Sequence, residues 1–186
     1  MPASAKKVAT YADVLAAPEH LVAELVDGEL ITSPRPASPH ALVGSRLGAK
    51  LLTLFDDGDG GPGGWILLDE PELHLGEHVL VPDIASWRRE RMPEMPDVAY
   101  FELAPDFCCE ILSPSTARFD RVKKVPLYAT HGVRHVWLID PAMQTLEIFS
   151  LDGESYRLLA THGGDDVVEA PPLDAVPIEL ARLWRR

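Results

Sequence analysis

Two short apolar segments, each interrupted by one carboxylate, place the strongest constraint on how this chain can fold. They are VLVPDIASW, which carries Asp83, and FCCEILS, which carries Glu110. Apolar, β-branched and aromatic runs of this length are typical of buried strands, where a carboxylate is costly unless it is paired, hydrogen-bonded or bound to a metal. The intervening residues are long enough for an antiparallel return. We therefore expect two neighbouring strands whose carboxylates lie close together.

Side chains alternate along a strand, so Glu110 shares one face with Cys108 and Leu112, while Cys109 and Ile111 face the other way. The two adjacent cysteines are therefore expected to be buried thiols on opposite faces, not a disulfide. They are the only cysteines of the chain, and without a CxxC spacing a zinc site built from thiolates is not expected.

The N-terminal third predicts a helix, a hairpin and a second helix. Residues 10–20 read as a short helix capped by Thr10, and Asp27-Gly28 predicts a hairpin between strands within 21–33. A proline-rich turn then leads into an amphipathic helix from about Pro39, and residues 56–64 form a glycine-rich loop that we expect to be mobile. The buried face of this second helix is expected to hold Leu42, Leu47, Leu51 and Leu54.

The rest of the chain predicts strands with one long helical segment among them. Strands are expected at 65–73, 79–87, 107–113 and 133–140, a hairpin around Asp152-Gly153, and a final helix at 177–184. Residues 115–132 are helical, with a kink or turn at Pro126. Because no internal repeat or second hydrophobic unit is found, residues 1–186 are expected to form a single α/β (α+β) domain with a mixed sheet flanked by helices.

The charge balance limits the partners that this chain can bind. It has 17 basic and 29 acidic residues, a net charge of −12, which disfavours nucleic acid unless the positive charges gather locally. Two segments hold seven of the basic residues: Arg88, Arg89 and Arg91, and Arg118, Arg121, Lys123 and Lys124. We expect them to line the rim of one cleft, the alternative being two ordinary solvated segments.

The chain shows no sign of a membrane span or a secretory signal. No apolar run approaches the ~20 residues that a membrane helix needs. The N-terminal MPASAKKVATYADVL has two lysines but no apolar segment behind them. A cytoplasmic location is therefore expected.

Asp83 and Glu110 are candidate ligands of a hard cation such as Mg²⁺ or Mn²⁺. Each also has a simpler explanation, since Asp83 follows Pro82 as a turn residue would and Glu110 could form a buried salt bridge. Both explanations stay open for the residues taken one at a time. The two carboxylates together favour a metal site.

A metal site that hydrolyses phosphodiesters also gains from a lysine that stabilises negative charge. The direct place for it, two residues after the glutamate, is occupied by Leu112. The candidates are therefore Lys123 and Lys124 on the following segment. Lys124 shares a helical face with Asp120 and Tyr128, whereas either lysine could also be an ordinary solvated one.

Four stretches together resemble the Uma-two family of restriction endonucleases, within the PD-(D/E)XK nuclease superfamily: AELVDGELITSPRPASPH, VPDIASW, FCCEILSPST and DRVKKVPLYATHGVRHVWLIDP. The resemblance covers about residues 20–160 and implies a restriction-endonuclease-like fold. It implies Asp83 and Glu110 as metal ligands, with the carbonyl of Ile111 as a third. It also implies that the catalytic lysine has moved from the position of Leu112 to Lys124.

Two further residues are candidates for the same site. Glu24, in AELVDGEL, matches an additional carboxylate that such nucleases often supply from their N-terminal region; the alternative is a hairpin or surface role. His40, in SPHALV, either faces the cleft or is a helix-start residue without a chemical role.

The sequence thus favours a Mg²⁺-dependent nuclease that hydrolyses phosphodiester bonds of nucleic acid, most simply DNA. Since nucleases of this kind often pair, a homodimer is one expected assembly. Two alternatives remain, a non-catalytic binding module on the same fold and a metal-dependent phosphoesterase of small substrates.

Overall fold

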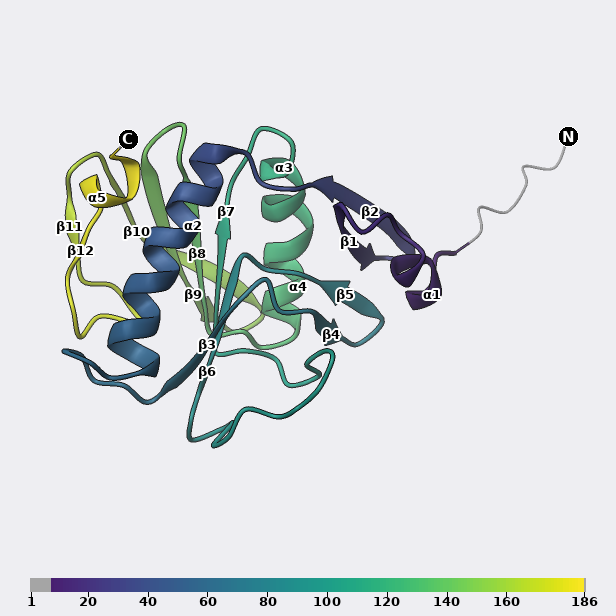
Figure 1. The fold of residues 1–186 in the computed structure, drawn as a ribbon, viewed down its shortest axis with the longest axis horizontal. Helices are drawn as coiled ribbons and strands as arrows, with labels where there is room; N and C mark the ends of the chain where they lie inside the picture. The colour runs from purple at the N-terminus through teal and green to yellow at the C-terminus, as the bar shows by residue number, and fades with distance from the viewer. Residues whose placement is uncertain (1–7, 186) are drawn as a thin grey trace, which may run out of the picture.

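A six-stranded mixed sheet forms the centre of the computed structural model, which describes residues 8–185 (Figure 1). Its strand order is β10-β9-β8-β7-β6-β3. Only β7 and β8 run parallel; the other neighbours are antiparallel. The strands are β3 (Trp65–Asp69), β6 (Ile84–Arg88), β7 (Phe107–Ile111), β8 (His135–Asp140), β9 (Thr145–Asp152) and β10 (Ser155–Gly163). Helices flank this sheet, which confirms the predicted fold class.

A smaller antiparallel sheet lies beside the central one. Its order is β2-β1-β5-β4, from β1 (Leu21–Val26), β2 (Glu29–Pro34), β4 (Leu73–Leu75) and β5 (His78–Leu80). Asp27 and Gly28 join β1 to β2 with φ angles of 51° and 70°, the left-handed conformations of the hairpin turn that this dipeptide predicts. The short helix α1 (Tyr11–Leu15) begins after Thr10, whose N–H donates to the carboxylate of Asp13 at 2.8 Å.

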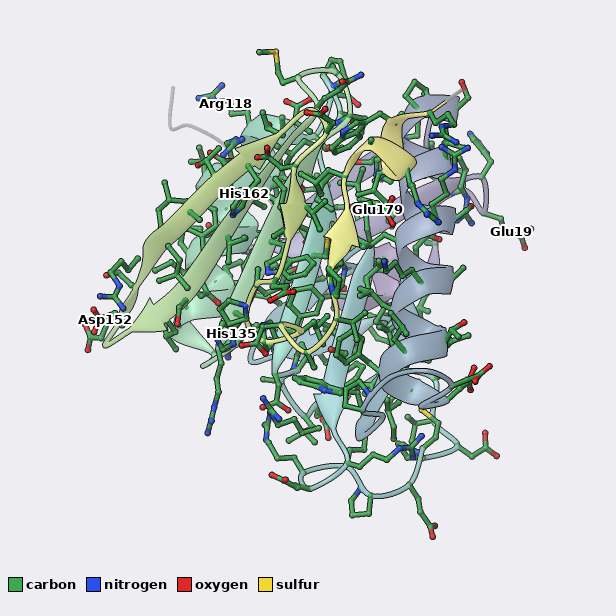
Figure 2. All side chains as sticks on the ribbon, turned by 90° about the vertical axis from the view of Figure 1, so that its left-hand side faces the viewer. Glu19, Arg118, His135, Asp152, His162 and Glu179 are labelled. Atoms are coloured by element: carbon green, nitrogen blue, oxygen red, sulfur yellow. The ribbon has the colours of Figure 1, made fainter. Side chains whose placement is uncertain are left out.

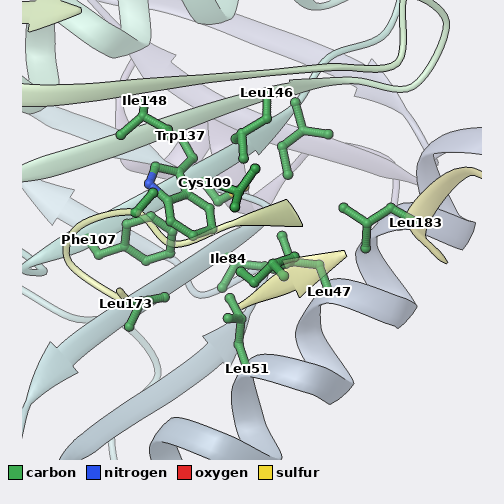
Figure 3. Packing of buried hydrophobic residues seen from close by; sticks show 14 of the residues in the cluster. Leu47, Leu51, Ile84, Phe107, Cys109, Trp137, Leu146, Ile148, Leu173 and Leu183 are labelled. Carbon is green, nitrogen blue, oxygen red and sulfur yellow. The ribbon is translucent and has the colours of Figure 1, made fainter. Parts of the chain in front are cut away.

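Helix α2 (Ser38–Leu51) and the π-helical turn η1 (Leu52–Asp56) cover one face of the central sheet. The fully buried positions are spaced four apart: Val43, Leu47, Leu51 and Phe55. Leu42 and Leu54, which the sequence predicts on the same face, are only partly buried, and Leu54 packs against the core cluster at its edge. Figure 3 shows Leu47 and Leu51 packed towards Ile84, Phe107 and Trp137 of the sheet.

The C-terminal segment completes this layer beside α2. It forms β11 (Val167–Val168), β12 (Ile178–Glu179) and α5 (Ala181–Trp184). The predicted helix at 177–184 is thus half wrong, because its first residues pair as a strand with β11.

The opposite face of the central sheet is covered by a continuous helical segment with a widened middle. It consists of α3 (Ala117–Phe119), the π-helical turn η2 (Asp120–Lys124) and α4 (Val125–Thr130). Pro126, the second residue of α4, has no N–H to donate to the preceding turn. The predicted interruption at this proline therefore takes the form of a π turn directly before it, a feature that is frequent at functional sites.

Two of the predicted strands are each broken in two. Residues 65–73 become β3 and β4, and residues 79–87 become β5 and β6, so the chain crosses from the central sheet to the small sheet and back. Asp83 therefore lies in the segment that returns from β5 to β6, and not in a strand as predicted. β6 begins at Ile84, which pairs with Cys109 in the antiparallel β6–β7 ladder. Asp83 is the residue directly before this first pair, at the end of the ladder where Glu110 follows Cys109 in β7.

The two cysteines of β7 pack on opposite sides of the central sheet, as predicted. Cys109 belongs to the hydrophobic cluster under α2, and Cys108 belongs to the cluster under α4. Both are free thiols. Within residues 8–185, no helix has the length and apolar character needed to span a bilayer.

Candidate functional site

A cavity of about 260 Å³ lies between the small sheet, the start of α2 and the turn that precedes α3. Its lining is rich in ionisable side chains. Five are carboxylates (Glu24, Glu70, Asp83, Glu110 and Asp120), two are permanent cations (Arg35 and Lys124), and one is a histidine (His40). Negative charge is therefore in clear excess within the cavity.

Asp83 is held by a hydrogen bond to each of its oxygens. The backbone N–H of Ile111 donates to Oδ2 at 2.6 Å, and Nε2 of His40 lies 3.0 Å from Oδ1. Burial lowers the pKa of His40, but the hydrogen bond and negative charge of Asp83 outweigh it, so the pKa is raised overall. The other ring nitrogen, Nδ1, is buried without a hydrogen-bond partner among the described residues.

Glu110, fully buried at the end of β7, receives its hydrogen bonds from the helical layer. Nζ of Lys124 lies 2.9 Å from Oε1 and 3.0 Å from Oε2, and the hydroxyl of Tyr128 donates to Oε1 at 2.5 Å. Burial raises the pKa of Glu110, with Asp120 adding to the rise and Lys124 opposing it. Two donors thus fix the orientation of this carboxylate, which lines the cavity.

Lys124 is the cation on which the carboxylates converge. Its side chain is 3% exposed, and its Nζ lies 3.1 Å from Glu24, 2.9 Å from Glu110 and 4.0 Å from Asp120. Nζ also donates to the backbone carbonyl of Val81 at 2.9 Å. The backbone N–H of Val81 in turn donates to the carboxylate of Glu24. Burial lowers the pKa of Lys124, but the surrounding carboxylates outweigh it and raise the pKa well above its ordinary value. Lys124 therefore stays an ammonium.

Asp120 gives the site a pH dependence that stability measurements can detect. Burial raises its pKa from 3.8 to about 6, although Lys124 and Thr116 act in the opposite direction. The folded protein thus holds this proton more tightly than the unfolded chain, so stability falls as the pH rises from about 4 to about 6. Asp120→Asn has no carboxyl proton at this position, so we expect the decrease in its free energy of unfolding over this pH range to be smaller by about 3 kcal/mol. Urea unfolding across this pH range, with EDTA present, measures it; equal pH profiles for both proteins would contradict the assignment.

The structure brings all five of the predicted catalytic residues to this one cavity: Asp83, Glu110, Lys124, Glu24 and His40. Their catalytic roles remain predictions. Lys123, the competitor of Lys124, points elsewhere, since its exposed Nζ lies 2.6 Å from Asp27 of the hairpin. Ile111 contributes its N–H to Asp83, and its carbonyl as a third metal ligand also remains a prediction.

Three groups that line the cavity or contact its lining residues were not assigned a role from the sequence. Tyr128 and Asp120 share a helical face with Lys124, a spacing visible in the sequence, but nothing there showed that all three are buried against Glu110. Arg35 lies in a proline-rich turn that gives no sign of facing the site. The third group is a set of hydroxyls in the turn before α3, where Ser113 lies 2.9 Å from Ser115 and 3.0 Å from Thr116.

The predicted basic rim is wrong. Of the seven residues in the two clusters, only Lys124 lines the cavity. Arg88 ends β6 at the far end from Asp83 and lies over the ring of Trp65, 4.4 Å from its centre. Most of the others are neutralised in ion pairs: Arg89 with Asp56, Arg91 with Asp106, Arg121 with Glu147 and Lys123 with Asp27.

The residues present fit a divalent cation that keeps part of its water shell. No group of three or more His, Cys, Asp or Glu side chains within residues 8–185 is arranged as a ready-made metal cage. Mg²⁺ seldom needs one, because it commonly binds one or two carboxylates together with water and substrate phosphate. Asp83 and Glu110 are two such carboxylates that line the same cavity, and the excess of negative charge around Lys124 is what a cation would offset.

The sheet, its flanking helices and this cavity define an α/β protein with a restriction-endonuclease-like fold. A family profile described as "Putative restriction endonuclease", Uma2, matches residues 9–181. The chain therefore belongs to the Uma2 family, as its resemblance predicted.

Comparison with solved structures agrees with this fold. A crystal structure of a putative nuclease belonging to DUF820 from Anabaena variabilis matches with a TM-score of 0.77 at 24% sequence identity. The match covers 94% of this chain and 97% of that chain. No curated protein matches the sequence.

Proposed function

We propose that this protein hydrolyses phosphodiester bonds of nucleic acid with the help of a divalent cation, Mg²⁺ or Mn²⁺. One observation carries the proposal. Asp83, directly before β6, and Glu110, in the neighbouring strand β7, line one cavity, and the buried ammonium of Lys124 lies 2.9 Å from Glu110. Membership of a family described as restriction endonucleases supports nucleic acid as the substrate.

Asp83 and Glu110 would hold the cation, and His40 and Tyr128 would orient them through their hydrogen bonds. The bound cation would supply Lewis-acid stabilisation of charge and a water of lowered pKa. Lys124, fixed by Glu24 and Glu110, would place a positive charge behind Glu110, where it would stabilise negative charge in the cavity without contacting the phosphate. Lys124 would then take the place of the catalytic lysine of the superfamily, supplied by the helical segment after β7 instead of by the strand.

Arg35 is the cation of the cavity wall that a substrate phosphate can reach. Its side chain is 58% exposed, and its contacts are long, at 3.3 Å to Glu70 and 3.4 Å to the carbonyl of Glu19. Lys124, in contrast, is enclosed by carboxylates. A phosphate would therefore draw Arg35 away from Glu70 at little cost, because exposed ion pairs contribute little.

We expect Arg35→Ala to raise KM for a phosphodiester by about tenfold or more, the value of a charge-assisted hydrogen bond, with a smaller change in kcat. Arg89→Ala is the matched control, since Arg89 is also exposed and paired with a carboxylate, Asp56, but lies outside the cavity. Steady-state kinetics on bis(p-nitrophenyl) phosphate gives both constants. An unchanged KM in the Arg35 variant would exclude it from phosphate binding.

A cleavage assay on duplex DNA, single-stranded DNA and RNA, with Mg²⁺, Mn²⁺ or EDTA, tests the proposed function. We expect hydrolysis that requires the metal. If no substrate is cleaved under any of these conditions while nucleic acid is bound, the fold serves as a non-catalytic binding module.

A second candidate is a metal-dependent phosphoesterase of small substrates. The failure of the predicted basic rim favours it, because a cavity lined mainly by carboxylates attracts a long polyanion poorly. Hydrolysis of bis(p-nitrophenyl) phosphate without cleavage of any nucleic acid would establish this candidate in place of the nuclease.

A further inference from the structure

A second hollow, of about 450 Å³, lies on the outer side of α2, between this helix and the C-terminal segment. Figure 2 shows this side of the molecule, with Glu179 labelled on the strand before α5. Four basic residues line the hollow: Arg46 and Lys50 from α2, and Arg182 and Arg185 from the C-terminal segment. We call these four residues the basic groove.

As far as residues 8–185 are concerned, the positive charge of the basic groove is largely uncompensated. Nζ of Lys50 donates to the carbonyl of Pro177 at 2.7 Å, and Arg46 donates to carbonyls of the C-terminal segment, that of Arg182 at 2.8 Å. These carbonyls fix the positions of the ammonium and guanidinium groups, but they carry no net charge that would neutralise them. Among the described residues, the groove's only ion pair joins Arg182 to Glu179 at 2.8 Å. One carboxylate thus faces four cations, in a chain whose net charge is −12.

We propose that the basic groove binds the sugar–phosphate backbone of the nucleic acid whose phosphodiester bond enters the cavity. This inference rests on the proposed function and names the surface that holds the substrate. The partner follows from charge complementarity, since nucleic acid is the polyanion that a phosphodiesterase must hold. The groove also supplies the cluster of positive charge that the segments after Asp83 and Glu110 fail to provide.

Helix α2 links the groove to the cavity. His40 lines the cavity in the first turn of α2, and Arg46 and Lys50 follow six and ten residues later. These separations correspond to about 9 and 15 Å along the helix axis and to about 80–120° around it. Since each nucleotide advances 3.4 Å along a strand of the duplex, about three to five nucleotides would span the distance. A strand that leaves the cavity across α2 would therefore meet the groove.

The test is a binding measurement that does not depend on catalysis. Fluorescence anisotropy of a short labelled DNA duplex, with EDTA present and over a range of salt concentrations, gives affinity and its salt dependence. The test variant is Arg182→Glu/Arg185→Glu, in which both residues are exposed. The control is Arg134→Glu/Arg157→Glu, which changes the net charge equally at exposed positions outside both hollows. Thermal melting of both variants checks folding, and Lys50→Glu tests the groove from the α2 side.

We expect the groove variant to lose about two phosphate contacts, so that the slope of log K against log salt falls by about 2 while the control keeps the wild-type slope. If the affinity for the duplex fell equally in the groove variant and the control, the effect would be one of overall charge and the proposal would be wrong. It would also be wrong if the wild type did not bind the duplex at low salt. The proposed function fails separately, if binding is intact but neither nucleic acid nor bis(p-nitrophenyl) phosphate is hydrolysed with metal.

Discussion

Replacing Lys124 by methionine should lower the free energy of unfolding by about 3–5 kcal/mol, the cost of removing one partner from a buried ion pair. Methionine keeps most of the length and apolar character of the stem. The loss therefore reports the charge, which Glu24, Glu110 and Asp120 share at 2.9–4.0 Å. Without the ammonium, these three buried carboxylates repel one another and have to take up protons or water.

The pH dependence separates this cause from a packing defect. Carboxylates without their cation can be protonated at low pH, so the difference between wild type and Lys124→Met should shrink as the pH falls below the raised pKa of Asp120, about 6. Lys123→Met is the matched control. It removes an exposed pair with Asp27, and exposed ion pairs contribute little to stability. Urea unfolding of both variants, with EDTA present, gives the comparison; equal losses in the two variants would contradict the central position of Lys124.

The contacts of Lys124 and Tyr128 with Glu110 explain why a charge interrupts the apolar sequence of β7. Glu110 receives hydrogen bonds from Lys124 and Tyr128, so part of the cost of burying it is offset by partners that the sequence places four residues apart on one helical face. The offset is incomplete, because one ammonium serves three carboxylates. A divalent cation bound by Asp83 and Glu110 would supply the charge that is missing.

Residue patterns close together in the sequence predicted the parts of the fold that local forces determine. The hairpin at Asp27-Gly28 follows from backbone conformation, and the opposite orientation of Cys108 and Cys109 follows from alternation along a strand. That only one of Lys123 and Lys124 reaches Glu110 follows from helical periodicity, since residues adjacent on a helix diverge by about 100°.

Features that depend on contacts between distant segments could not be predicted in the same way. The two strands that break to cross between the sheets read as continuous apolar runs, and nothing local places Asp83 in the crossing. The prediction that the two basic clusters line one cleft failed for a related reason. Nearness to a site residue along the chain says little about direction, and Arg88 lies at the opposite end of β6. The basic groove, in contrast, joins α2 to the C-terminal segment, more than a hundred residues later in the sequence.

Asp83→Asn should lower the rate of metal-dependent phosphodiester hydrolysis by about 10²–10³-fold or more, because the variant loses one of two anionic ligands to the cation that stabilises the transition state. Asparagine keeps the shape of the side chain, and its amide oxygen can still accept the N–H of Ile111. The cavity should therefore stay intact, and removing one of several like charges should leave stability in EDTA equal or higher.

Metal-induced stabilisation provides a readout that does not depend on activity. A cation that binds the folded protein raises its melting temperature, so Mg²⁺ or Mn²⁺ should stabilise the wild type and have little effect on Asp83→Asn. The control is Asp69→Asn, which removes a carboxylate beside this one, since Asp69 pairs with Ile84 in the ladder but does not line the cavity. If Asp69→Asn lost activity and metal-induced stabilisation to the same extent as Asp83→Asn, both effects would come from the total negative charge near the cavity and not from a metal ligand. If Asp83→Asn kept both, the cation would have to be held by other residues, and the proposed roles of Asp83 and Glu110 as its ligands would be wrong.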